Sequence, residues 1–207
     1  MNRNILFYSR CLLAFVAILG TTLQIYLYGA GMLLYYIVLS NLLVAVFSVY
    51  MVVAMYHKKD LQNQSFLRVK AGVTMSIMIT FVIYHFMLAP LVTDFWRLEN
   101  ILCHYIVPLY FFIDTLLIDH QSQYRWYDPI FWTVLPVLYM IFALFNGLVV
   151  KIPIPAAVDS PFAYFFLNVT KYGWQFVLTY AAGIFVSYVL AGYVFYMVKS
   201  LSWKRKD

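Results

Sequence analysis

Charge is scarce in this sequence: only 11% of the 207 residues are Asp, Glu, Lys or Arg, whereas 65% are hydrophobic. A soluble domain of this size has too small an interior to bury so much apolar surface, so the composition excludes a water-soluble fold. A lipid bilayer removes the difficulty, because about 20 apolar residues cross it as one helix. The composition therefore predicts a single all-α domain over residues 1–207, built from six transmembrane helices.

Cysteine is also rare, with two residues in the whole chain. Cys11 falls near the start of the first apolar stretch and Cys103 near the start of the fourth, which begins on the other membrane face. Two thiols at opposite faces are too far apart for a disulfide. Both are expected to be buried free thiols.

Six apolar stretches are separated by short polar or proline-containing segments. The expected spans cover about residues 7–28, 32–56, 69–92, 100–118, 129–150 and 173–198. The longest connection contains Pro153, Pro155 and Pro161, which oppose helix formation. Its apolar part, residues 162–167, is expected to lie at the membrane interface or to fold back onto the bundle.

The net charge of +6 does not indicate nucleic-acid binding, because the positive residues lie at helix ends and not in a stripe. Cationic loops resist translocation, so the side richer in Lys and Arg is expected to be cytoplasmic. That side carries Arg3, Arg10, Lys58, Lys59, Arg68, Lys70, Arg125, Lys199, Lys204, Arg205 and Lys206. The other side carries only Arg97, Lys151 and Lys171. Both termini are therefore predicted to be cytoplasmic, with the protein in the plasma membrane.

Polar side chains inside the spans are the candidate site residues, because ionisable and amide groups are costly in hydrocarbon. They are Ser40 and Asn41 in the second span, His85 in the third, and His104 and Asp114 in the fourth. The helical rise places Ser40, His85 and His104 about 12, 10 and 6 Å below the outer surface, so we expect them to share one cavity. Asp114 lies about 15 Å further in and about 80° around the helix from His104, and is expected to support the cavity only through other helices.

Each candidate also has a structural interpretation. Ser40 can bond to the backbone carbonyl of Tyr36, as membrane serines commonly do. Asn41 can join two helices, and His85 can be a satisfied histidine of the bundle. For Asp114 a structural partner on the inner side, such as a Tyr hydroxyl, would be enough.

His104 lies four residues before Pro108, which has no N–H to donate to the His104 carbonyl. A kink is therefore expected beside the histidine. A metal site formed by His85, His104 and either Asp94 or Glu99 is an alternative, but no HxxxH or HExxH spacing supports it. The sequence has neither a phosphate-binding glycine loop nor a G-x-S-x-G elbow, so the chemistry of soluble hydrolases is not expected.

Several strings resemble a bacterial six-span family that is similar to the eukaryotic androgen-induced-gene proteins and the androgen-dependent TFPI-regulating protein. They are YYIVLSNLL (35–43), TFVIY (80–84) with LAP (88–90), HYIVP (104–108) with Asp114, WTVLP (132–136) with Tyr139, and PFAYFFLN (161–168). The likeness covers nearly the whole chain, and its strongest part is the string in the fourth span.

The resemblance implies a membrane-embedded hydrolase of fatty acid esters of hydroxy fatty acids, with a threonine nucleophile in the second span and a histidine in the fourth. The histidine corresponds to His104. The threonine position corresponds to Ile37 or Val38, and Ser40 lies about one helical turn away.

The sequence therefore predicts an intramembrane hydrolase of lipid (fatty-acyl) esters, in which Ser40 is the nucleophile and His104 the base. Asn41 or a Tyr hydroxyl would stabilise the oxyanion. No cofactor is implied, and a lipid ester in the bilayer is the expected partner. The alternative is a lipid- or small-molecule-binding protein, or a transporter, that uses the same cavity without catalysis.

Overall fold

The chain forms an all-α membrane bundle. The computed structural model describes residues 2–155, 157 and 160–201, and within these residues all regular structure is helical. Six helical stretches are long and apolar enough to cross a membrane: Arg3–Tyr28, Tyr36–Tyr56, Gln64–Leu91, Leu98–Ile118, Asp128–Val150 and Val169–Ser200. Many large apolar side chains stay exposed around the bundle, as expected where lipid replaces water. The six-helix prediction is confirmed.

Several spans are composite. In the third span, α3 (Gln64–Ile83) continues into the π-helical η2 (Tyr84–Leu88) and the 3₁₀ turn η3 (Ala89–Leu91). In the fourth span, α4 (Leu98–Ile101) continues through the π-helical η4 (Leu102–Ile106) into α5 (Val107–Ile118). In the fifth span, α6 (Asp128–Phe131) precedes α7 (Val134–Phe145) and the π-helical η5 (Asn146–Val150). The remaining elements are α1 (Arg3–Tyr28), η1 (Ala30–Leu34), α2 (Tyr36–Tyr56), η6 (Phe165–Leu167) and α8 (Val169–Ser200).

Two spans begin earlier than hydropathy predicts because asparagine side chains cap them. Asn63 accepts a hydrogen bond from the Phe66 amide at 3.0 Å, so α3 starts in the polar loop and not at residue 69. Asn168 accepts one from the Lys171 amide at 3.0 Å and starts α8 before Gly173, whose φ of 80° marks a kink. Hydropathy detects the membrane-embedded part of a helix, whereas the cap sets its first residue.

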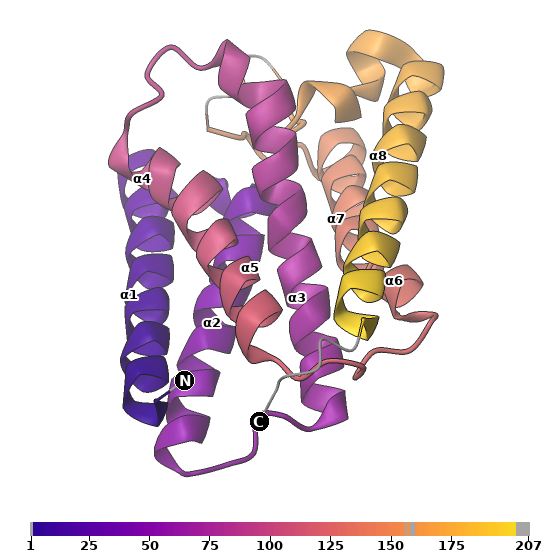
Figure 1. The fold of residues 1–207 in the computed structure, drawn as a ribbon. Coiled ribbons are helices and arrows are strands. Elements are labelled where there is room, and N and C mark those ends of the chain that lie inside the picture. Colours follow the sequence, from indigo (N-terminus) through magenta and orange to yellow (C-terminus); the bar gives the residue numbers. More distant parts are fainter. Residues whose placement is uncertain (1, 156, 158–159, 202–207) are drawn as a thin grey trace.

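The helices α1, α2, α3 and α5 form one group, and α7 and α8 stand beside α3 (Figure 1). In the first group α1 packs on α2, and α3 packs on both α2 and α5. The start of α1 and the end of α8 lie at the same end of the bundle, as an even number of spans requires (Figure 1). The Lys and Arg distribution predicts that this end is cytoplasmic.

A buried charge cluster lies toward that end and joins four spans. Asp114 accepts hydrogen bonds from Arg10 Nε and Nη2, both at 3.1 Å, and from Lys70 Nζ at 2.6 Å. Lys70 also donates to Asp119 at 2.5 Å, and Lys199 donates to the Asp119 backbone carbonyl at 2.6 Å. Arg10, Lys70 and Lys199 are at most 2% exposed, so these three cations are buried in the bundle and do not lie in solvated loops. The partners of Asp114 are Arg10 and Lys70 and not a Tyr hydroxyl.

The proline-containing connection folds back onto the bundle, which confirms the second of the two predicted arrangements. Phe162, Phe166 and Leu167 are buried. Asn146, at the start of η5, donates to the Pro161 carbonyl at 3.1 Å, and Tyr35 donates to the Pro155 carbonyl at 2.6 Å. The described part of this connection therefore forms an inner wall and is not a floating loop.

Phe162 packs directly against Gly147 in η5. A Cβ on Gly147 would lie 2.1 Å from the Phe162 ring, which is only 2% exposed and has no room to turn. We expect Gly147→Ala to lower the free energy of unfolding by about 1–3 kcal/mol, measured as thermal unfolding in detergent micelles. The control is Gly183→Ala, where a Cβ meets nothing within 4 Å and the helix gains propensity. Equal stability of the two variants would contradict this packing.

Candidate active site

A cavity of about 650 Å³ lies between the group formed by α1, α2, α3 and α5 and the two helices α7 and α8. One wall, formed by α1 and by α4 and η4, is polar, and the opposite wall, formed by α7, α8 and the folded-back connection, is largely apolar. The polar wall includes Gln24, Tyr28, Arg97, Glu99, Asn100 and His104. The apolar wall includes Pro136, Val137, Met140, Phe166, Leu167, Leu178, Ile184 and Phe185.

The π turn η4 carries His104 and arises where the proline interrupts the helix. The Val107 amide bonds to the Leu102 carbonyl, five residues back. In a π turn the next carbonyl, of Cys103, would accept from Pro108, which has no N–H. Asn41 in α2 donates to this carbonyl at 3.0 Å instead. The irregularity expected next to His104 is therefore present, and the side chain that satisfies it belongs to another helix.

His104 is held in one orientation on the polar wall. Its Nδ1 lies 2.9 Å from the Asn100 carbonyl oxygen, which accepts only, so Nδ1 carries the proton. The ring stacks on Tyr84 with 3.5 Å between centroids. Nε2 has no hydrogen-bond partner among the described residues, and the side chain lines the cavity. A neutral imidazole with a bonded Nδ1–H and an available Nε2 has the arrangement of a general base.

Thr80 of α3 lines the cavity, and Ser40 lies behind it. Ser40 Oγ donates to the Ile37 carbonyl at 3.1 Å and lies 2.9 Å from Thr80 Oγ1. The Ser40 hydroxyl therefore bonds to the backbone carbonyl of Ile37 and not, as was expected, to that of Tyr36. Thr80 and Ile37 line the cavity, whereas Ser40 does not. Thr80 lies one helical turn from Tyr84, whose ring contacts His104.

Tyr84 brings a hydroxyl to the same place. Its oxygen accepts a hydrogen bond from Asn100 Nδ2 at 2.6 Å, which leaves its own proton available. Tyr84 is buried and lines the cavity beside His104. It is the Tyr hydroxyl best placed to stabilise an oxyanion.

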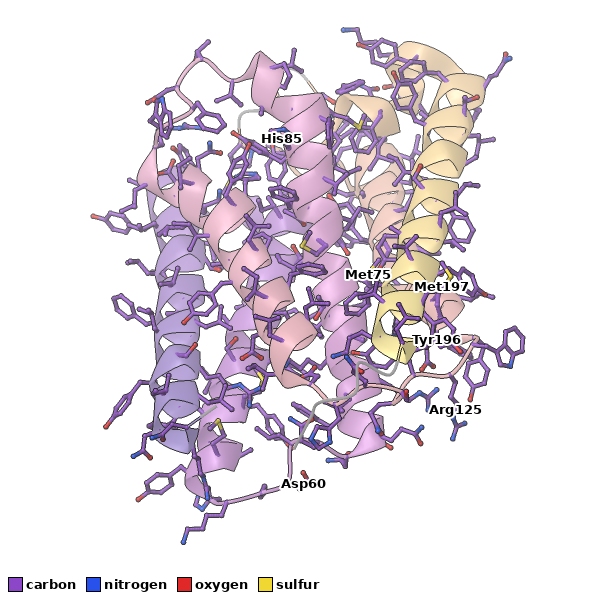
Figure 2. All side chains as sticks on the ribbon, viewed as in Figure 1. Asp60, Met75, His85, Arg125, Tyr196 and Met197 are labelled. Atoms are coloured by element: carbon purple, nitrogen blue, oxygen red, sulfur yellow. The ribbon has the colours of Figure 1, made fainter. Side chains whose placement is uncertain are left out.

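Three other predicted residues do not face the cavity. Asn41 is fully buried and joins α2 to η4, Asp114 belongs to the charge cluster, and His85 is exposed. His85 Nδ1 lies 3.1 Å from the Tyr105 hydroxyl, and Figure 2 places His85 toward the end of the bundle opposite Asp60. Its expected place in the cavity was therefore wrong.

The structure also bears on the two cysteines and on the alternative metal site. Both thiols are free; Cys103 is buried as expected, whereas Cys11 is partly exposed. Within the described part of the chain, no three His, Cys, Asp or Glu side chains gather where they could hold a metal ion.

Sequence reasoning missed Thr80, Tyr84 and Gln24 as lining residues of the cavity, and it considered Glu99 only as a metal ligand. A threonine or tyrosine in an apolar span gives little signal, because its hydroxyl commonly bonds within its own helix. Gln24, four residues before the end of α1, was the stronger signal, since an amide inside a span is costly. The chain matches no protein-family model, no curated protein and no solved structure.

Proposed function

We propose that this protein is an intramembrane hydrolase of fatty-acyl esters that takes its substrate from the outer leaflet of the plasma membrane. The observation that carries the proposal is His104, whose Nε2 has no partner among the residues that the structure describes and which lies on the polar wall of an otherwise apolar cavity. An amphiphile fits such a cavity with its acyl chain against α7 and α8 and its ester group near the histidine.

The proposed nucleophile is Thr80, with Ser40 as the residue that positions it. In the first step, Thr80 Oγ1 attacks the acyl carbon while its proton passes to His104 Nε2, and Tyr84 donates a hydrogen bond to the oxyanion. The bond to the alcohol oxygen then breaks, and that oxygen takes the proton from the imidazolium. Water repeats the sequence on the acyl-threonine and releases the fatty acid. The threonine position of the resemblance corresponds to Ile37 or Val38, neither of which has a hydroxyl, and Ile37 lines the same cavity.

The nucleophile can be identified by labelling with a fluorophosphonate that carries an alkyl chain. We expect the wild-type chain to be labelled, Thr80→Val to be unlabelled, and Ser40→Ala to be labelled about tenfold more slowly, because a lost hydrogen bond loosens the hydroxyl. The control is Thr133→Val, which removes another cavity-lining threonine whose hydroxyl bonds to the Ile130 carbonyl at 2.7 Å. Labelling that survives in Thr80→Val but disappears in Ser40→Ala would indicate that Ser40 and not Thr80 is the nucleophile.

Non-catalytic lipid binding is the second candidate. Its support is that His104 Nδ1 bonds to a backbone carbonyl and not to a carboxylate, so no acid stabilises an imidazolium. A wild-type chain that binds fluorescent fatty-acyl probes but neither reacts with the fluorophosphonate nor hydrolyses esters would favour binding. Movement of the probe across proteoliposomes in such a chain would favour transport.

A further inference from the structure

The polar wall of the cavity has hydrogen-bonding capacity that its own contacts leave unused. Gln24 is only 5% exposed and lines the cavity, yet its amide has no hydrogen-bond partner among the described residues. A buried amide without a partner is destabilising, whichever way its oxygen and nitrogen are assigned. Such a group indicates that something else, a ligand or water, satisfies it.

Gln24 lies next to three polar residues that contact one another at one end of the cavity. It lies one turn before Tyr28 in α1, and the Tyr28 hydroxyl donates to Glu99 Oε1 at 2.8 Å. Arg97 donates to the Tyr28 oxygen at 2.9 Å, and its Nε lies 3.5 Å from Glu99 Oε1. Both contacts to Glu99 use Oε1, so Oε2 has no partner among the described residues. We call Gln24, Tyr28, Arg97 and Glu99 the head-group corner.

The atoms of this corner that have no hydrogen-bond partner determine which chemical groups a ligand needs. Glu99 and His104 line the same cavity. The Glu99 Oε2 of a carboxylate and the Nε2 of a neutral His104 only accept hydrogen bonds, and the Gln24 amide can accept one. Arg97 and Glu99 neutralise each other, so the corner has no net charge to attract an ion. A carboxylate or phosphate head would bring a second negative charge beside Glu99, whereas hydroxyl groups supply the donors that the corner lacks.

We propose that the head-group corner binds the uncharged, hydroxyl-bearing head of an acyl ester of a polyol, such as a monoacylglycerol. The head hydroxyls donate to Glu99 Oε2 and to the Gln24 amide, and the ester carbonyl then lies toward His104 and Thr80. From the proposed function this inference takes only that the cavity holds an acyl ester.

Ether analogues separate head-group binding from hydrolysis, because they contain no ester bond to cleave. The measurement is displacement of a fluorescent dodecyl probe from the purified chain in lipid nanodiscs by 1-O-dodecyl glycerol, dodecyl methyl ether or dodecanoate. We expect the glycerol ether to bind about tenfold tighter than the methyl ether, as one or two additional hydrogen bonds would give, and dodecanoate to show no such gain.

The variants Glu99→Gln and Gln24→Leu are each expected to reduce this preference for the glycerol ether to about threefold or less. Gln175→Leu, at an exposed glutamine of α8, is the matched control and should keep the full preference. In Glu99→Gln the amide oxygen can still accept the hydrogen bond from the Tyr28 hydroxyl. If this variant fails to fold, the preference measured for Gln24→Leu tests the inference.

Equal binding of the glycerol and methyl ethers by the wild-type chain would overturn the inference and would mean that water alone satisfies the corner. A preference for dodecanoate would overturn it in favour of an anionic head. Neither result bears on hydrolysis. Conversely, a strong glycerol preference in a chain that cleaves no ester would contradict the proposed function and leave this inference standing.

Discussion

Asp114→Asn is expected to lower the free energy of unfolding by about 3–5 kcal/mol, which is the usual cost of removing one partner from a buried ion pair. Arg10 and Lys70 both donate to this carboxylate at 3.1 Å or less, and all three side chains are buried. In the variant, Asp119 alone would face two buried cations. Thermal or denaturant unfolding in mixed micelles measures the loss.

The control for this variant is Asp60→Asn, which changes an exposed carboxylate whose oxygen accepts from the Gln62 amide. Asparagine can accept the same bond, so stability should change by no more than about 0.5 kcal/mol. Combining Asp114→Asn with Lys70→Met should recover part of the loss, since an uncharged pair no longer needs compensation. Unfolding of Asp114→Asn at the same point as wild type would show that the cluster contributes little.

His104→Gln is expected to lower kcat/KM for an acyl ester about 10²–10⁴-fold, the range that a general base contributes. Affinity for the fluorescent dodecyl probe should stay within about threefold, because the cavity keeps its shape and its apolar wall. Hydrolysis assays on purified chains in micelles, together with probe titration, separate the two effects.

His85→Gln is the matched control, because this histidine is exposed and makes its polar contact with Tyr105 outside the cavity. We expect its kcat/KM to stay within about twofold of wild type. Equal losses in the two variants would indicate a general effect of removing a histidine. Undiminished hydrolysis by His104→Gln would remove the base from the mechanism.

The six-helix architecture could be predicted from the sequence. Apolar stretches of membrane-spanning length identify the six helices, and counting residues along a helix gives depth. Counting does not give the direction in which a side chain points when the partners of the helix are unknown. His85 and Thr80 illustrate this, because five residues correspond to about 140° around a regular α-helix and His85 lies in the π-helical η2. Thr80 therefore faces the cavity while His85 does not.

The buried charge cluster could not be predicted because its cations are near span ends, where a lysine or arginine usually reaches water. Arg10 and Lys70 look like loop charges in the sequence and become buried only through packing with Asp114. The π turn η4 could not be predicted from the sequence either. Pro108 indicates a missing backbone bond, but only the bundle reveals that Asn41 of another helix supplies it.

The same cluster affects how the chain assembles in the membrane. Arg10 and Lys70 are synthesised 104 and 44 residues before Asp114. Each of the first and third spans is therefore made before the carboxylate that pairs with its cation, and until then the long side chain is expected to reach toward the headgroups at that end of the bundle. The fourth span, which brings Asp114, also carries His104, so the span that completes the charge cluster is the one that delivers the imidazole to the cavity.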